Sequence, residues 1–291
     1  MPATPEPTVI TADACPGGLE RSCSKDWVRR SPDVNSLNRI EAFFGGEAYT
    51  PHRHDTYSIG YTLQGVQSFR YRGSQLDSTP GKVIVLHPDE LHDGRAGNES
   101  GFSYRMLCLQ PSMVRDALGC RASSLPFAKD AVREDQKLIQ ALRAAYSVSD
   151  VGLEPVRLDH IVLQLSEGLL ALDPSAKTGR ETKIDSRAVK TAQEYLYANL
   201  ETVVRSQELE RVTQLNRYTL ARQFRRTLGT SPYRYLTMRR LDRVRQQLAG
   251  GATLADASIS SGFSDQAHMT RHFKASFGMS PGRWQRLQRM A

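Results

Sequence analysis

Two histidines stand two residues apart in the segment Pro51-His52-Arg53-His54-Asp55. Because alternate residues of a strand point to the same face, His52 and His54 are expected to share one side of a sheet. Imidazole nitrogens bind divalent metals and also form hydrogen bonds with polar ligands. The pair therefore predicts either a metal site or a polar binding site in the N-terminal half of the chain.

A second group of candidate residues consists of basic side chains that recur at an offset of 49 residues. Arg222 corresponds to Arg271, and Arg225 corresponds to Lys274. Arginine can pair bidentately with guanine, and both Arg and Lys bind phosphates. Two copies of one basic surface predict two copies of a nucleic-acid reading unit.

The basic residues lie on two segments whose apolar residues have helical spacing, at i, i+4 and i+8. These positions are Leu220, Phe224 and Leu228 in the first copy and Met269, Phe273 and Phe277 in the second. Such a stripe predicts an amphipathic helix with one buried face. In each copy a glycine, Gly229 or Gly278, follows as a left-handed C-cap, and a Ser-Pro pair then begins the next helix.

Cap and turn signals predict a short helix before each of these two helices. Asn216 is expected to cap the first helix of the pair, and Ser264, after a tight turn at Gly262, to cap the second. A short helix capped by Thr253 precedes that turn, and a long helix from Ser231-Pro232 joins the two copies. A short helix, a tight turn and a capped helix form a helix-turn-helix motif, which is therefore predicted twice.

The formal net charge of +8 is concentrated in the C-terminal part of the chain. Residues 184–291 contain 18 Lys and Arg against 8 Asp and Glu, whereas the preceding residues contain 21 against 23. This asymmetry is typical of a domain that faces nucleic-acid phosphates. No apolar run approaches the length of a membrane span and the N-terminus does not resemble a signal peptide, so we expect a cytoplasmic protein without a membrane partner.

Short runs of β-forming residues separated by glycines and prolines fill residues 36–111. Strands at this spacing without intervening helices predict a small antiparallel barrel or sandwich. Thr56, Ser58, Gly60 and Thr62 share strand parity with the two histidines, and their small side chains would leave space inside. The barrel is therefore expected to hold a small polar molecule.

The spacing His52-x-His54-x3-Ser58-x6-Gly65 resembles the first cupin motif, and Pro80-Gly81 with Pro88-Asp-Glu-Leu-His92 resembles the second. Ser58 stands where a metal-binding cupin has Glu. Three histidines can still bind a divalent metal, but the missing carboxylate favours hydrogen bonding to an effector. We therefore expect no metal and no cofactor. The effector-binding candidates are His52, His54, Ser58, Tyr71, His92 and Arg105.

The C-terminal hundred residues resemble the AraC/XylS type of transcriptional regulator. The resemblance rests on Ser231-Pro-Tyr-Arg-Tyr235, on Gly262-Phe-Ser-Asp-Gln266 and on the Arg271–Pro281 segment. It implies a regulator, an activator rather than a repressor, that acts on promoter DNA with RNA polymerase and carries an N-terminal cupin-type sensor. Glu210 and Ser258 stand where the family has a small apolar residue in the first helix of each motif.

The DNA-binding candidates lie on the face of each predicted recognition helix opposite its apolar stripe. They are Arg217, Tyr218, Thr219, Arg222 and Arg225 in the first helix and Gln266, Ala267, His268, Arg271 and Lys274 in the second. The N-terminal residues of such a helix approach base edges in double-stranded DNA. Arg225, Lys274 and also Arg283 lie further along and are expected to meet phosphates.

The predicted organisation is multidomain α+β. A flexible tail (1–35) precedes a cupin-like barrel (36–111), a helical region (112–173), a linker (174–184) and an all-α DNA-binding domain (185–291). The stripe Ile161, Leu165, Leu169 and Leu172 is more apolar than a small barrel needs, so we expect the helical region to form a homodimer.

Two alternatives to a ligand-responsive regulator remain open. One is a metal-dependent cupin enzyme fused to a DNA-binding domain, against which Ser58 argues. The other is an architectural DNA binder without sequence preference, against which the capped recognition helices argue.

Overall fold

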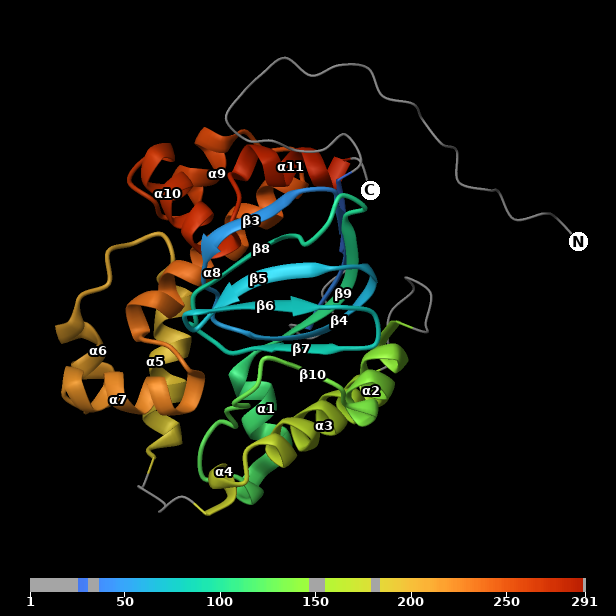
Figure 1. Ribbon diagram of the computed structural model, residues 1–291. Helices are drawn as coiled ribbons and strands as arrows, with labels where there is room; N and C mark the ends of the chain where they lie inside the picture. The colour runs from blue at the N-terminus through green and yellow to red at the C-terminus, as the bar shows by residue number, and fades with distance from the viewer. Residues whose placement is uncertain (1–25, 31–36, 147–154, 179–183, 290–291) are drawn as a thin grey trace, which may run out of the picture.

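The computed structural model describes residues 26–30, 37–146, 155–178 and 184–289 (Figure 1). Its N-terminal half contains two antiparallel sheets. The six-stranded sheet has the order β1 (Trp27–Arg30), β2 (Asn38–Phe44), β9 (Phe102–Leu109), β4 (Tyr57–Gly65), β7 (Val83–Leu86) and β10 (Val132–Arg133). The four-stranded sheet has the order β3 (Glu47–His52), β8 (His92–Ala96), β5 (Gln67–Tyr71) and β6 (Ser74–Ser78). The predicted cupin-like antiparallel fold is confirmed, although the described strands form two facing sheets and not one closed barrel.

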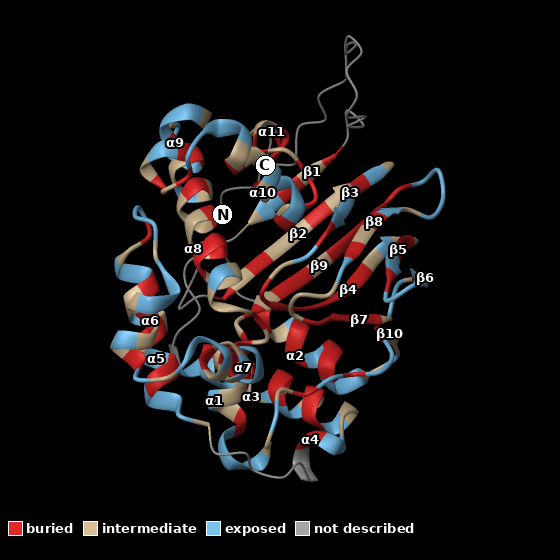
Figure 2. Cartoon of the chain, turned by 90° about the vertical axis from the view of Figure 1, so that its left-hand side faces the viewer, coloured by how far each residue is buried: buried red, intermediate tan, exposed pale blue. Residues whose placement is uncertain are grey.

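Residues of the six-stranded sheet alternate between two faces. Tyr57, Ile59 and Tyr61 of β4 belong to the core beneath the helices, whereas Ser58 faces the interior between the sheets. The central strands β9, β4 and β7 are buried along most of their length (Figure 2). Since both faces are covered, the interior face is available to line a cavity.

Three helices cover the outer face of the six-stranded sheet: α1 (Pro111–Leu118), α2 (Gln136–Tyr146) and α3 (Pro155–Leu172). Ile161, Leu165 and Leu169 of α3 are at most 1 % exposed and pack in one core with residues of α1, α2 and the sheet. The expectation that this stripe faces a second protomer is therefore wrong. A single helix must bury a wide stripe because it packs against two helices and a sheet at once.

The segment between the two domains includes a short helix, α4 (Ser175–Thr178), which occupies part of the predicted linker 174–184. Residues 179–183 of that linker lie outside the described residues. The predicted tail 1–35 also lies outside them except for residues 26–30, which include β1.

The C-terminal domain consists of seven helices: α5 (Ser186–Ala198), α6 (Ser206–Thr213), α7 (Arg217–Leu228), α8 (Pro232–Ala249), α9 (Leu254–Ser260), α10 (Gln266–Phe277) and α11 (Pro281–Arg289). Helices α6–α7 and α9–α10 form the two predicted helix-turn-helix motifs, which α8 connects. Gly229 and Gly278 adopt the left-handed conformation expected of C-caps, with φ of 68° and 67°. Asn216, Ser231 and Thr253 cap their helices as predicted.

The second motif is capped by Asp265 and not by Ser264. The Asp265 side chain accepts a hydrogen bond from the backbone N–H of His268 at 2.6 Å, and the Ser264 hydroxyl bonds to Asp265 instead. Both residue types are good N-caps, so the sequence alone did not separate neighbouring candidates.

The two motifs differ in how they are anchored to the rest of the molecule. The first motif packs on α5 in a core of its own that includes Val189, Leu220 and Phe224. The second shares a continuous core with the interior of the sheets, in which Phe273 and Trp284 join Phe69 and Met106. Helix α10 contacts β3 and α11 contacts β1, as Figure 2 shows for α11, so these two helices close one end of the sheet domain.

Candidate functional site

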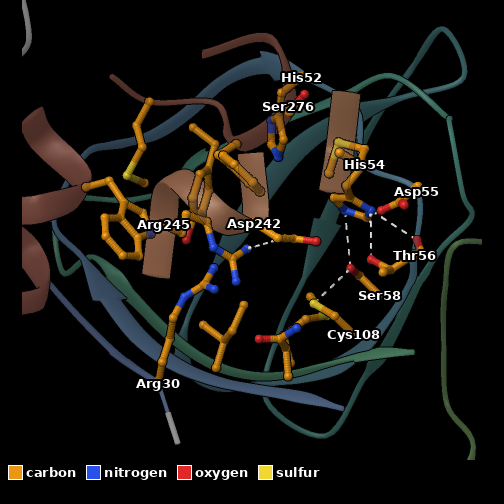
Figure 3. Close-up of a pocket in the computed structure, with 18 of the residues that line it drawn as sticks. Arg30, His52, His54, Asp55, Thr56, Ser58, Cys108, Asp242, Arg245 and Ser276 are labelled. Carbon is orange, nitrogen blue, oxygen red and sulfur yellow. Dashed lines mark hydrogen bonds and ion pairs between the residues drawn. The ribbon is translucent and has the colours of Figure 1, made fainter. Parts of the chain in front are cut away.

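A cavity of about 560 Å³ lies between the two sheets and the C-terminal helices. Strands β1–β5 and β7–β9 with the adjoining loops line it on one side, and α8, α10 and α11 line it on the other. Its walls combine apolar residues with charged and polar ones (Figure 3). The acidic and basic residues of the lining, with its cysteine, are Arg30, His52, His54, Asp55, His92, Asp93, Cys108, Arg239, Asp242, Arg243 and Arg245.

The three predicted histidines meet in this cavity. His52 is the last residue of β3 and pairs in register with His92, the first residue of β8, while His54 lies in the loop before β4. The ring centroids of His52 and His92 are 4.2 Å apart, and those of His54 and His92 are 4.8 Å apart. The strand pairing brings together residues that are forty positions apart in the sequence.

Each of these rings has one nitrogen bound to a backbone carbonyl. Nδ1 of His52 donates to the carbonyl oxygen of Thr50 (2.9 Å), that of His54 to Thr56 (3.0 Å) and that of His92 to Glu90 (3.0 Å). Because a carbonyl can only accept, the neutral ring must carry its proton on Nδ1 and a lone pair on Nε2.

Burial holds all three rings in the neutral form. It lowers the pKa of His54 to about 3 and the pKa of His92 to about 4, and it also lowers the pKa of His52 well below its usual value. The neighbouring histidines add to this effect for His52 and His54, since protonating one ring disfavours a second charge nearby. At neutral pH the cluster is a set of uncharged acceptors.

Ser58 lies beside this cluster, as its strand parity predicted. Its hydroxyl is 3.2 Å from Nε2 of His54 and 3.5 Å from the sulfur of Cys108 on the paired strand β9 (Figure 3). Since Nε2 of His54 carries no proton, the Ser58 hydroxyl donates to it. Burial raises the pKa of Cys108, so this thiol stays protonated at neutral pH.

Two other predicted effector residues are not brought to the cavity. Arg105 forms an ion pair with Glu41 at 2.9 Å and lies over the ring of Tyr146. The Tyr71 hydroxyl bonds to Nδ1 of His87 at 2.8 Å. Arg105 has the opposite strand parity to Met106 and Cys108, which face the interior, and Tyr71 lies at the end of β5.

The cavity also contains functional candidates that the sequence did not single out. Arg30 and Arg245 lie across the cavity from the Ser58 side (Figure 3). Asp55 forms an ion pair with Arg239 of α8 at 2.7 Å, and both side chains are buried. Asp55 could have been identified from the sequence, because it directly follows His54. The arginines of α8 could not, because they line the cavity only when the two domains dock.

The first recognition helix, α7, presents its predicted DNA-binding face to solvent. Arg217, Tyr218 and Arg222 are exposed, with Tyr218 at 70 %, while Leu220 and Phe224 are buried. Glu210, the departure noted in α6, has a local role, because its carboxylate accepts from the backbone N–H of Arg217 at 2.8 Å. It thereby helps to cap α7 and neutralises part of the Arg217 charge.

The second recognition helix, α10, likewise exposes Gln266, Ala267, Arg271 and Lys274. His268 is half-buried, and its Nε2 lies 2.9 Å from Nε2 of His272. Arg283 is not available to phosphates as predicted. It is 6 % exposed and donates to the carbonyls of Glu47 and Ala48 in β3.

The C-terminal ends of both recognition helices contact the sheet domain. The backbone N–H of Thr50 donates to Gly278 (2.9 Å) and that of Arg53 to Ala275 (3.1 Å), both at the end of α10. The Arg115 guanidinium donates to the carbonyl of Thr227 near the end of α7 (3.2 Å). The N-terminal ends of α7 and α10 lie away from these contacts, so the sheet domain holds the helices without covering their exposed N-termini.

Both domains of the chain match known protein families. Residues 35–166 match the model of the AraC-like ligand binding domain, and residues 209–287 match that of a helix-turn-helix domain. The HTH-type transcriptional activator RhaS of Yersinia pseudotuberculosis is 26 % identical over 251 residues, covering 83 % of this chain and 91 % of RhaS. An uncharacterized HTH-type regulator of Bacillus subtilis, YbfI, is 25 % identical over 235 residues, covering 79 % and 86 % of the two chains.

Solved structures agree with this assignment at the level of the fold. ToxT from Vibrio cholerae superimposes with a TM-score of 0.61 at 10 % identity, covering 87 % of this chain and 98 % of ToxT. A structure of ToxT with an unsaturated fatty acid bound gives the same TM-score at 12 % identity, covering 94 % and 99 %. The arrangement of a β-rich domain followed by two helix-turn-helix motifs is thus common to these chains. Among the described residues, no helix is long and apolar enough to cross a membrane.

Proposed function

The chain belongs to the AraC type of transcriptional regulators, and on that premise we propose that a small molecule in the cavity between its domains controls its binding to promoter DNA. The observation that carries this proposal is the composition of the cavity wall. Residues of the sheets and residues of α8, α10 and α11 line the same space. A ligand that contacts both sides must change the free energy of domain docking, and docking positions the recognition helices.

Short chains of contacts support the coupling. His52 donates to Thr50, and the N–H of Thr50 donates to Gly278 at the end of α10. On the other side, the N–H of Asp89 donates to the carbonyl of His54 at 2.7 Å. The Asp89 carboxylate in turn lies 3.8 Å from the Arg225 guanidinium of α7. Each recognition helix is therefore connected to the cavity through two or three residues.

The lining supports an effector with an apolar part and an acidic or polar group. Apolar walls come from residues such as Phe69, Met238 and Trp284, and the positive charge comes from the arginines of β1 and α8. Arginine recognises carboxylates by charge-assisted hydrogen bonds. The related fold of ToxT accommodates an unsaturated fatty acid, which has this chemistry.

The DNA-binding surface supports a bipartite site. Helix α8 connects the motifs rigidly, so two recognition helices that enter major grooves on one side of the duplex read sequences about 10 bp apart. Tyr218, Arg222 and Arg271 are assigned to base contacts, and Arg225 and Lys274 to phosphates.

We further propose that the protein is a cytoplasmic activator rather than an enzyme, that it works with RNA polymerase, and that it acts as a homodimer. The activator role follows the RhaS relatives. Ser58 in place of a carboxylate supports a binding role for the cavity. The stripe of Ile161, Leu165 and Leu169 on α3 is buried within the protomer and is therefore not proposed as the dimer surface.

The test is the affinity for a promoter fragment in the presence of carboxylic acids from benzoate to oleate, measured by fluorescence anisotropy. A compound that binds the cavity should change the affinity of the wild-type protein at least fivefold. Ser58→Met fills the cavity and should abolish the response, whereas Ser100→Met, at an exposed turn, should retain it. A response that survives Ser58→Met would place the effector elsewhere.

A further inference from the structure

The side chains of His52, His54 and His92 are held together more rigidly than contact with an effector requires. One nitrogen from each ring lies within 4.8 Å of those of the other two. The residues come from β3, from the loop before β4 and from β8, and the backbone of each site is fixed by strand pairing or by a hydrogen bond. Rigid elements thus hold three imidazoles around one point.

The three hydrogen bonds from Nδ1 to backbone carbonyls give this point a definite chemistry. They leave the unprotonated Nε2 atoms as the nitrogens that remain for a ligand. An outer hydrogen bond from the second ring nitrogen to a carbonyl is the usual arrangement of metal-ligating histidines, because it fixes both tautomer and ring orientation. Among the described residues, the Ser58 hydroxyl is the hydrogen-bond donor recorded for these Nε2 atoms, and it serves His54 alone.

Unprotonated ring nitrogens held this close together are stabilised by a hydrogen-bond donor or a cation between them. The Ser58 hydroxyl supplies a donor for His54 alone. An acidic effector cannot supply one for the other two rings, since a carboxylate is itself only an acceptor.

We propose that His52, His54 and His92 bind one divalent transition metal, Zn²⁺ or a close relative, through their Nε2 atoms. Neutral imidazoles are preferred ligands for these metals. Zn–N bonds of about 2.0–2.1 Å would require the rings to move inward by roughly an ångström from their present separation. Ser58 takes the place of a fourth protein carboxylate, so a coordination position stays open toward the cavity.

The open position gives the acidic group of the effector a place to bind. This part of the inference rests on the proposed function, whereas the metal site itself rests only on the three histidines. Through the hydrogen bond from His52 to Thr50, a metal would also stiffen the strand that holds Gly278 of α10. The metal site departs from the expectation drawn from the sequence, where Ser58 in place of the carboxylate favoured hydrogen bonding to an effector over a metal.

The test is Zn²⁺ binding to the full-length protein without a histidine tag, measured against a chromophoric chelator. Neither DNA nor effector is present, so failure of the effector proposal does not affect the result. We expect one Zn²⁺ per chain, with at least a 100-fold loss of affinity in His52→Gln and in His92→Gln. His272→Gln is the matched control, because it removes the His268–His272 pair on α10, where Zn²⁺ could also bind.

A second measurement covers the case in which the cavity variants fail to fold. Co²⁺ added to the wild-type protein should give the intense visible absorption bands of a metal site with a low coordination number. Zn²⁺ should also raise the melting temperature of the protein. Zn²⁺ binding that persists in His52→Gln, or that is lost only in His272→Gln, would overturn the proposal. Stabilisation by ethylammonium but not by Zn²⁺ would also overturn it, and would make the cluster a site for a protonated amine.

Discussion

The carboxylate of Asp55 lies 2.7 Å from the guanidinium of Arg239, and this ion pair joins the cavity loop of the sheet domain to helix α8. The Asp55 side chain is 3 % exposed and that of Arg239 is 14 % exposed. Burial raises the pKa of the Asp55 carboxyl, and the Arg239 guanidinium opposes this change. Because the pair is almost fully desolvated and lies between domains, it makes domain docking depend on groups that an effector can contact.

Removing Asp55 should weaken docking. A buried charge left without any partner typically costs about 3–5 kcal/mol, and the cost here should be smaller because Arg239 keeps Asp242 at 3.2 Å. We expect Asp55→Ala to separate the domains, seen as a larger radius of gyration and faster proteolysis, and to make DNA affinity independent of effector. Glu41→Ala is the matched control, because its 2.9 Å pair with Arg105 lies within the sheet domain. Equal effects of the two substitutions on domain separation would contradict a docking role for Asp55.

Gly278 is expected to tolerate no side chain. Its φ is +67°, and a Cβ there would lie 2.7 Å from Nδ1 of His52 and 2.9 Å from the carbonyl oxygen of Thr50. Gly251 also has positive φ, but a Cβ there would meet nothing within 4 Å. Gly251→Ala should therefore cost only the backbone strain, about 1 kcal/mol. Gly278→Ala should lower the free energy of unfolding in urea by more than Gly251→Ala does. It should also weaken the contact between β3 and α10.

Similar losses of stability in the two variants would show that Gly278 serves only as a helix C-cap. A loss of Zn²⁺ affinity in Gly278→Ala, with Gly251→Ala unchanged, would further indicate that the end of α10 and the His52 ring are coupled. Both variants keep every cavity side chain, so the comparison isolates the backbone contact.

Acid should destabilise the sheet domain through its buried histidines. Burial, with a smaller contribution from Arg72, lowers the pKa of His87 to about 4. The ring accepts from the N–H of Ala128 at 2.9 Å, which also requires an unprotonated nitrogen. Since the unfolded chain takes up a proton near pH 6.5 and the folded chain does not, stability is complete above that pH and falls as the pH drops toward 4. The loss from this one group approaches roughly 3 kcal/mol.

The measurement is urea unfolding of metal-free protein between pH 7 and pH 4.5. His87→Gln can retain the acceptor for Ala128 but does not titrate, so the dependence of its unfolding free energy on pH should be shallower than that of the wild type. His160→Gln, at an exposed position of α3, should leave the dependence unchanged. An unchanged slope in His87→Gln would mean that this ring is already charged in the folded protein.

Much of the fold could be predicted because its signals are local. The caps at Asn216, Ser231 and Thr253, the glycines after both recognition helices and the strand parity of Ser58 each depend on a few neighbouring residues. The histidine cluster was predictable for the same reason, with the cupin resemblance supplying the pairing of β3 with β8.

What could not be predicted depends on the docking of the domains. Arg283 was expected in the DNA-binding face, but the structure buries it against β3. Arg239 and Arg245, which carried no expectation, line the cavity. The stripe of α3 was misinterpreted for a related reason: an apolar surface does not reveal in the sequence whether its partner is the same chain or a second one.

The two recognition helices provide the sharpest test of how the protein reads DNA. Arg222 and Arg271 occupy equivalent exposed positions in α7 and α10, and each can pair with a guanine. Arg222→Ala should relax sequence preference in one half of a bipartite site and Arg271→Ala in the other, each at a cost of about 1–3 kcal/mol. Binding-site selection on both variants measures this directly. Loss of preference at the same base pairs in both would refute the reading by two helices.

Arg225 and Lys274 provide the comparison between phosphate contact and domain contact. Both are exposed near the ends of the recognition helices, but Arg225 alone lies 3.8 Å from a carboxylate of the sheet domain, that of Asp89. Lys274→Ala should weaken binding to all DNA sequences alike, and it should reduce the slope of log affinity against log salt concentration by about one. Arg225→Ala should do the same and, because it also removes the link to Asp89 and His54, should reduce the response to effector. Matching effector responses in the two variants would mean that the Arg225–Asp89 contact carries no signal, and that control of α7 passes through other contacts, such as that of Arg115 with the carbonyl of Thr227.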